Sequence, residues 1–194
     1  HQVPIEVHDN TLRARFHVFA GWANLTAYDN RSPDGSGALS ASAYRFNTCL
    51  VRDNDFYSAF FDWGNEVQLI DNSTPEEFEH EGSLIFHMIG QAFVSNCMLN
   101  KLENIRTFIC GEVAYESSTL SGNLNLYIGD NISMTDIVFD PVFELDSFVH
   151  VDSVQRVEFT NVTFNNEINF FSLIENTDLE FQSVNLLDSL NVIH

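Results

Sequence analysis

Positively charged side chains are scarce in this sequence. The 194 residues include eight Lys+Arg against 28 Asp+Glu, which gives a formal net charge of −20. Such a chain repels the phosphate backbone of nucleic acids and the surface of anionic membranes. We therefore expect no nucleic-acid partner, and we interpret the acidity as a source of solubility in preference to a dedicated cation-binding surface.

Long apolar runs are also missing. No stretch approaches the roughly 20 residues that a membrane-spanning helix needs, so we expect no membrane span. The first residues do not show the basic and then apolar pattern of a secretory leader. The sequence runs from His1 to His194 without an initiating Met, which indicates a mature or excised chain, or a segment of a longer one.

Cysteine is rare and odd in number. Cys49, Cys97 and Cys110 cannot all pair within the chain, so at least one is free or pairs outside it. Their spacing lacks the C-x-x-C pairs of a structural zinc site, and their mostly apolar neighbours predict buried thiols. With 44% apolar and 13% aromatic residues, the chain is expected to fold as one domain over residues 1–194.

A repeat runs along the sequence. Its clearest copies share the pattern apolar-x-apolar-polar-polar-apolar-x-apolar and lie at Ile132–Phe139, Val157–Phe164 and Leu179–Leu186. This pattern predicts a short strand, a polar corner and a second short strand, with alternate side chains pointing inward.

The corners of this repeat recur at intervals of about 22–23 residues. They are expected at Asn24, Thr48, Asp71, Asn96, Ser117, Asp136, Asn161 and Ser183. A leucine-rich repeat has a similar period, but its Leu-rich framework is missing and Phe is abundant instead, at 18 residues. The period predicts an all-β, single-stranded parallel β-helix of about eight coils.

Stacked corners of a β-helix can form a hydrogen-bonded ladder. We expect such a ladder at Thr48, Asp71, Asn96, Asp136, Asn161 and Ser183. We also expect the side chains at Cys49, Cys97, Val162 and Val184 to line one inward row.

A family resemblance accompanies the repeat. Gly35-Ser-Gly-Ala-Leu39, followed by Phe46-Asn-Thr-Cys-Leu50 and later by Val94-Ser-Asn-Cys-Met98, resembles the G-G-A-[ILV] … x-[ST]-N-C-x-F pattern of polymorphic outer-membrane-type repeats. Those repeats belong to the right-handed, pectin-lyase-like β-helices. The resemblance covers the first half of the chain, and the second half matches only as strand-corner-strand copies.

The resemblance raises the question of catalysis on polysaccharides. The hydrolases of this fold carry Asn-Thr-Asp, Asp-Asp, His-Gly and Arg-x-Lys motifs, of which only the first has a match here, at Asn176-Thr-Asp178. The lyases need a basic residue to abstract a proton next to a uronate, and this chain has few basic residues and no cluster of them. We expect no enzymatic activity and no cofactor. Asp53-Asn-Asp55 and Glu76–Glu81 could hold calcium through oxygen ligands, but neither has a spaced calcium-binding loop.

Five Asn-x-Ser/Thr triplets indicate a glycosylated, secreted protein. They begin at Asn24, Asn30, Asn72, Asn131 and Asn161. Asn24 and Asn161 are also expected corner residues, and one amide cannot both face inward and carry a glycan. We therefore expect Asn131 to be glycosylated more often than Asn161.

Two functions remain open from the sequence. The first is an extracellular structural or adhesive glycoprotein module. Its last repeat ends at His194 without a polar cap, so we expect either that the chain continues or that copies associate end to end into a filament. The alternative is a carbohydrate-active enzyme or a glycan-binding β-helix.

Overall fold

The computed structural model describes residues 4–140, 147–165, 168–174, 177–186 and 192–193. The described residues are all-β and contain no helix. Their strands are β1 Ile5–His8, β2 Arg15–Gly21, β3 Leu25–Tyr28, β4 Ala38–Arg52, β5 Phe56–Ile70, β6 Gly82–Ser95, β7 Met98–Leu99, β8 Leu102–Glu116, β9 Thr119–Leu120, β10 Asn123–Thr135, β11 Val138–Phe139, β12 Ser147–Thr160, β13 Thr163–Phe164, β14 Ile168–Ile174, β15 Asp178–Gln182, β16 Asn185–Leu186 and β17 Val192–Ile193.

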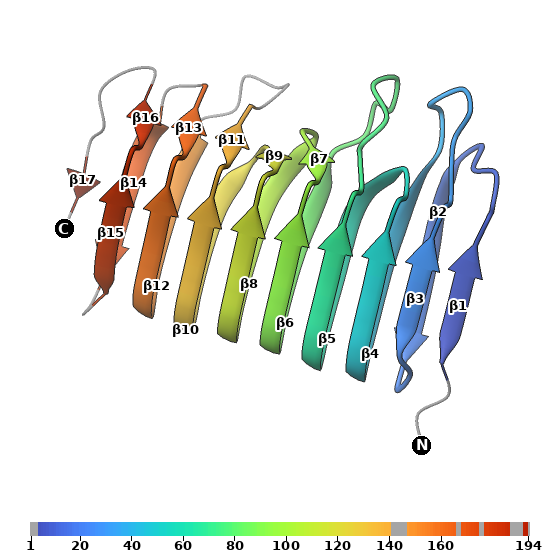
Figure 1. Cartoon of the computed structure of the whole chain (residues 1–194), viewed down its shortest axis with the longest axis horizontal. Helices are drawn as coiled ribbons and strands as arrows, with labels where there is room; N and C mark the ends of the chain where they lie inside the picture. The colour runs from blue at the N-terminus through green and yellow to red at the C-terminus, as the bar shows by residue number, and fades with distance from the viewer. Residues whose placement is uncertain (1–3, 141–146, 166–167, 175–176, 187–191, 194) are drawn as a thin grey trace.

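The strands stack as a parallel β-solenoid of about eight turns, as the repeat predicted. The long strands follow one another across one sheet, and the short strands β7, β9, β11, β13 and β16 form a second sheet. Figure 1 shows the coils lying side by side, with the N- and C-terminal ends of the chain at opposite ends of the stack. Each coil is therefore in contact with the coil before it and the coil after it.

Each long strand bends once, and the bend divides it into a first arm and a second arm. In β4 the arms lie on either side of Arg45, which has a φ of 53°. Ala41, Ala59 and Leu84 share one register column of the first arm and are buried. Cys49 and Val67 share an inward column of the second arm. The apolar core lies between the arms and the short strands.

A second corner follows the second arm in every coil. It has a positive φ at Asp9, Asp29, Asp53, Asp71, Asn96, Ser117, Asp136, Asn161 and Ser183. Asp, Asn and Ser side chains can hydrogen-bond to nearby backbone, and Asp and Asn tolerate this left-handed conformation better than most residues. The corners expected at Asp71, Asn96, Ser117, Asp136, Asn161 and Ser183 therefore lie at a shared corner.

The corners expected at Asn24 and Thr48 are wrong. Thr48 lies within β4 and is in register with Glu66 in the middle of the second arm of β5. The corners of these two coils are Asp29 and Asp53. The sequence is misleading at Thr48, because Cys49, like Cys97, follows a polar residue and precedes an apolar one.

The side-chain ladder runs one residue beyond the corners. The Nδ2 amide of Asn10 donates to Oδ1 of Asn30 at 2.7 Å, that of Asn30 to Asn54 at 2.7 Å, and that of Asn54 to Asn72 at 3.0 Å. Cys97 continues this inward column, with Val162 and Val184 further on, whereas Cys49 belongs to the column of Val67. At the corners themselves, Asn161 donates to Asp136 at 2.6 Å.

Candidate functional site

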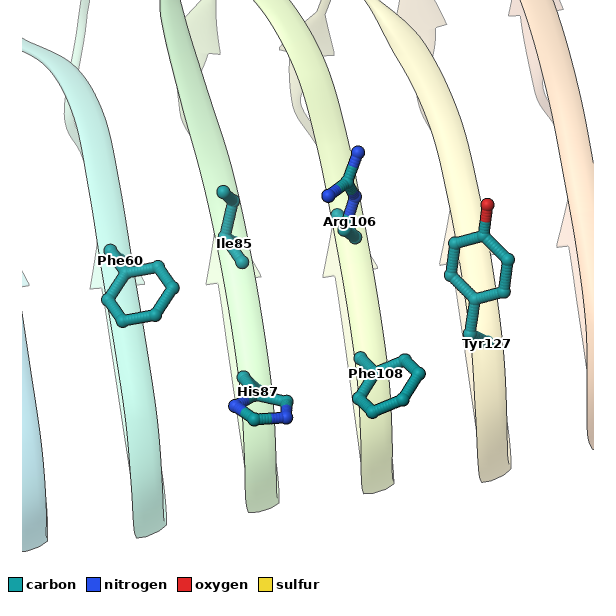
Figure 2. Close-up of a pocket in the computed structure, with 6 residues that line it drawn as sticks. All are labelled: Phe60, Ile85, His87, Arg106, Phe108 and Tyr127. Carbon is teal, nitrogen blue, oxygen red and sulfur yellow. The ribbon is translucent and has the colours of Figure 1, made fainter.

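The outward face of the first arm carries aromatic side chains. Phe61 of β5 and Phe86 of β6 point inward and are buried, while their neighbours Phe60 and His87 point outward. The outward side chains surround a hollow of about 420 Å³, lined by Phe60, Ile85, His87, Arg106, Phe108 and Tyr127. Figure 2 shows these six side chains standing on four adjacent strands, β5, β6, β8 and β10. We call this surface the aromatic face.

The rings of the aromatic face follow one another from coil to coil. His87 lies 5.2 Å from Phe108, measured between ring centroids, and Phe108 lies 6.3 Å from Tyr127. His150 of β12 continues the strip at 5.1 Å from Tyr127, although it is in register with Asn125. Because parallel pairing places equivalent positions of successive coils side by side, the rings of His87, Phe108 and Tyr127 occupy one outward column.

Polar groups lie within and beside this strip. The Nδ1 atom of His87 lies 2.8 Å from the Asp62 Oδ1 atom, and Tyr127 donates its hydroxyl hydrogen bond to Asn125. Arg106 is exposed, and no ion pair joins it to any carboxylate in the part of the chain that the structure describes. Its guanidinium therefore offers several hydrogen-bond donors to a ligand in the hollow.

The outward face of the second arm has a different character. Its outward positions include carboxylates in several coils, among them Glu66, Glu112, Glu116, Glu158 and Glu180. Arg156 pairs with Glu158 and Glu180. The column of rings on the first arm is itself flanked in register by Asp62 and Asp152, so carboxylates lie on both arms.

The five glycosylation triplets lie in very different surroundings. Asn30 and Asn72 are buried members of the asparagine ladder, so the folded chain has no space for a glycan there. Asn24 is half-buried and accepts hydrogen bonds from the backbone amides of Asn47 and Thr48. Asn131 and Asn161 are exposed, and glycosylation at these two positions stays a prediction.

The two acidic segments considered for calcium do not converge. Asp53 lies next to Arg52, and Asp55 lies next to Arg31 with 3.5 Å between the closest charged atoms. In the segment 76–81 the glutamates are exposed and Phe78 is buried against Tyr57. Within the described ranges, no group of three or more His, Cys, Asp or Glu side chains is placed to hold a metal ion.

The three cysteines are unpaired and buried. Burial raises the pKa of the Cys97 thiol to about 11 and also raises the pKa of Cys49 and Cys110. Thiols that remain protonated at neutral pH are poor nucleophiles. These residues contribute to the core, and the sequence-based prediction of buried thiols is confirmed.

The aromatic face was not found from the sequence. The signal for it was present, because Phe60-Phe61 and Leu84-Ile-Phe-His87 place apolar or aromatic residues at both alternating positions of a strand. A strand with one solvated face should alternate apolar and polar residues. These two segments do not alternate in this way, which indicates that their outer face is also apolar.

Comparison with known proteins finds no match to a family model, to a curated protein or to a solved structure. The class that the structure establishes is therefore the parallel β-solenoid. Nothing helical in the described part of the chain has the length and apolar character of a membrane span.

Proposed function

We propose that this protein is an extracellular, non-catalytic adhesive module that binds carbohydrate through its aromatic face. The observation that supports the proposal best is the strip of outward rings around Arg106, on a chain that is otherwise strongly acidic. Aromatic rings pack against the apolar faces of sugar rings. Arg106 and the His87–Asp62 pair supply donors and acceptors for hydroxyl groups.

The shape of the face suits an extended ligand. The rings of His87, Phe108, Tyr127 and His150 continue over four coils, and coils of a parallel sheet stand about 4.8 Å apart. A carbohydrate chain lying along the solenoid axis would contact several rings at once. The gain in affinity comes from many modest contacts on a surface that is already ordered.

The proposal also covers the location of the protein and the family of β-helices to which its fold is related. Secretion is supported by the two exposed triplets at Asn131 and Asn161. The resemblance of Phe46–Leu50 and Val94–Met98 to polymorphic outer-membrane-type repeats supports a relationship to the right-handed, pectin-lyase-like helices.

The test is a screen of oligosaccharides followed by calorimetric titration of the best ligand. Phe108→Ala is expected to raise the dissociation constant at least about tenfold, because it removes a ring from the middle of the strip. Phe93→Ala is the matched control, since Phe93 points outward from the second arm of β6. Equal loss of binding in both variants, or unchanged binding in Phe108→Ala, would contradict the proposal.

A second function, head-to-tail assembly into a filament, is supported by the two ends of the solenoid. Phe16 in β2 is in register with the buried Leu39, yet it is exposed. At the other end Phe181 is exposed although it stacks on the buried Phe159. Open strand edges with apolar residues are prone to pair with another chain.

A head-to-tail contact is heterologous and generates open filaments. Electron microscopy at increasing concentration is expected to show filaments for the wild type and none for Phe16→Asp. Filaments of equal length in both samples would exclude this mode of assembly.

A further inference from the structure

The bend between the two arms of each long strand uses unusual residues. It has a positive φ at Trp22, Arg45, Trp63, Met88, Ile109, Ile128 and Ser153. Register places these residues in one column along the solenoid. We call this column the ridge. The nine corners after the second arm need the same conformation, and all of them are Asp, Asn or Ser.

The ridge residues therefore carry a conformational cost that the other corner avoids. A left-handed conformation costs about 1–2 kcal/mol for an ordinary L-residue, and for a β-branched residue such as Ile109 or Ile128 it is a clear outlier. Strained backbone of this kind is concentrated at functional sites. If folding were the only requirement, Asn or Asp at the ridge positions would lower the conformational cost.

Exposure adds a second cost. The side chains of Trp22, Trp63, Ile109 and Ile128 are between 41% and 62% exposed. The positive φ values raise the conformational free energy of the backbone, and the exposed apolar side chains raise the solvation free energy. Neither feature therefore stabilises a monomer. Contiguous exposed apolar surface of this type marks an interaction site.

The ridge has a concave counterpart in the same chain. A notch of about 270 Å³ lies beside Ile109 and Ile128, with Gly111 and Asp130 among its lining residues. No side chain fits at Gly111, because a Cβ atom there would lie 2.5 Å from the Gly90 carbonyl oxygen. The N-terminal part of the ridge thus presents the protruding side chains of Trp22 and Trp63, whereas its C-terminal part borders the notch.

We propose that the ridge is the interface of a two-fold symmetric dimer of this chain. A two-fold axis through Met88 and perpendicular to the solenoid places Trp63 of one copy opposite Ile109 of the other, because these residues lie one coil to either side of Met88. The same operation places Trp22 opposite Ser153. Both indole rings of each copy then face the notch of the second copy, and every contact occurs twice.

Charge favours the same arrangement. The seven residues of the ridge include no carboxylate. Arg45 lies between the rings of Trp22 and Trp63, with its guanidinium carbon 4.4 Å from each ring centroid. In the dimer it comes opposite Ile128 and close to Asp130, which is exposed at the edge of the notch. The cation of one copy therefore meets the carboxylate of the other.

The experiment uses the two tryptophans as reporters. The chain has only these two, and both lie in the ridge, so tryptophan emission reports on this surface alone. As the protein concentration rises, we expect a dimer in light scattering coupled to size exclusion, together with a blue shift of emission. Both changes should have the same midpoint.

The decisive variant is the double substitution Ile109→Asn with Ile128→Asn. It removes two apolar contacts from each copy, and we expect dimerisation to weaken about 100-fold or more. It also relieves two strained positions, so the monomer should melt about 2–4 °C higher when measured at a dilution at which both proteins are monomeric. Ile85→Asn is the control, because Ile85 lies in an ordinary extended segment of the first arm. It should not change dimerisation.

Both measurements are made in the Phe16→Asp background, so that head-to-tail association does not mask a dimer. Two results would overturn the proposal: a Phe16→Asp protein that stays monomeric at millimolar concentration, and a double variant in that background that dimerises as Phe16→Asp alone does. Carbohydrate binding is measured independently of these results, so either proposal can fail without the other.

Discussion

Replacement of Asn54 by alanine tests whether the asparagine ladder holds the first coils together. Asn54 is fully buried, and its Nδ2 group donates to the carbonyl oxygens of Ala27 and Arg52 and to Oδ1 of Asn72. Its Oδ1 atom accepts from both the backbone amide and the side chain of Asn30. One side chain thus joins three consecutive coils.

The expected loss of stability follows from the groups that Asn54→Ala leaves behind. The backbone amide of Asn30 loses its acceptor, and the carbonyl oxygen of Ala27 loses a donor, both in the interior. Each buried group left without a partner costs about 1–3 kcal/mol. We therefore expect the free energy of unfolding to fall by about 3–5 kcal/mol, a large part of the stability of a typical domain.

Urea denaturation followed by circular dichroism measures this change. Asn131→Ala is the matched control, since Asn131 is exposed, and it should change the free energy of unfolding by less than about 0.5 kcal/mol. Asn10→Ala at the exposed end of the ladder should cost about 1 kcal/mol. A loss at Asn54 as small as that at Asn131 would show that the ladder does not stabilise the fold.

Further predictions concern a buried lysine and the buried thiols. Lys101 is buried and donates through Nζ to the carbonyl oxygens of Glu76 and Phe78. Lys101→Met should leave both oxygens without this donor, so the segment 75–81 should become the first site of limited proteolysis. Cleavage elsewhere first would contradict this role of Lys101. The three thiols should resist a thiol-specific reagent at pH 8 and react fully in urea. Because burial raises the pKa of Cys97 from 9.0 to about 11, its stabilising contribution is complete below pH 9 and disappears as the pH rises to about 11. Cys97 alone should lower the free energy of unfolding by about 2 kcal/mol over that window, and Cys49 and Cys110, whose pKa values burial also raises, should add to the loss. A stability that is constant there would refute the assignment.

Much of the fold could be predicted from the sequence, because one of its two corners uses residues with a recognisable preference. Asp71, Asn96, Asp136 and Asn161 lie at positive φ, and their short polar side chains stand out between apolar neighbours. Parallel stacking then follows from the recurrence of the same pattern. The prediction failed at Thr48, where a similar local pattern lies inside a strand.

The second corner could not be predicted by the same reasoning. Trp63, Ile109 and Ile128 adopt the conformation of a turn, yet their residue types favour strands. In the sequence the bend therefore cannot be recognised, and the 15 residues of β8 read as one continuous strand. Local preference is overridden here by the geometry of the stacked coils.

The aromatic face was missed for a different physical reason. Alternation assigns one side of a strand to the core only if the other side is polar, and in Phe60-Phe61 both sides are aromatic. The ladder was misplaced by one residue for a related reason, because corner residues and ladder residues are both Asp or Asn in Asp53-Asn54 and Asp71-Asn72. Only the backbone geometry shows which of the two side chains points inward.

The stacking of each coil on its two neighbours bears on how the chain folds during synthesis and how its length can evolve. Among the described residues each coil pairs only with its neighbours in the stack, so each can join the stack soon after it leaves the ribosome, with β3 serving as template for β4 and β4 for β5. Duplication or loss of a whole coil would preserve both corners and change only the length of the solenoid. A lineage carrying this fold could therefore lengthen or shorten its surfaces in steps of one coil.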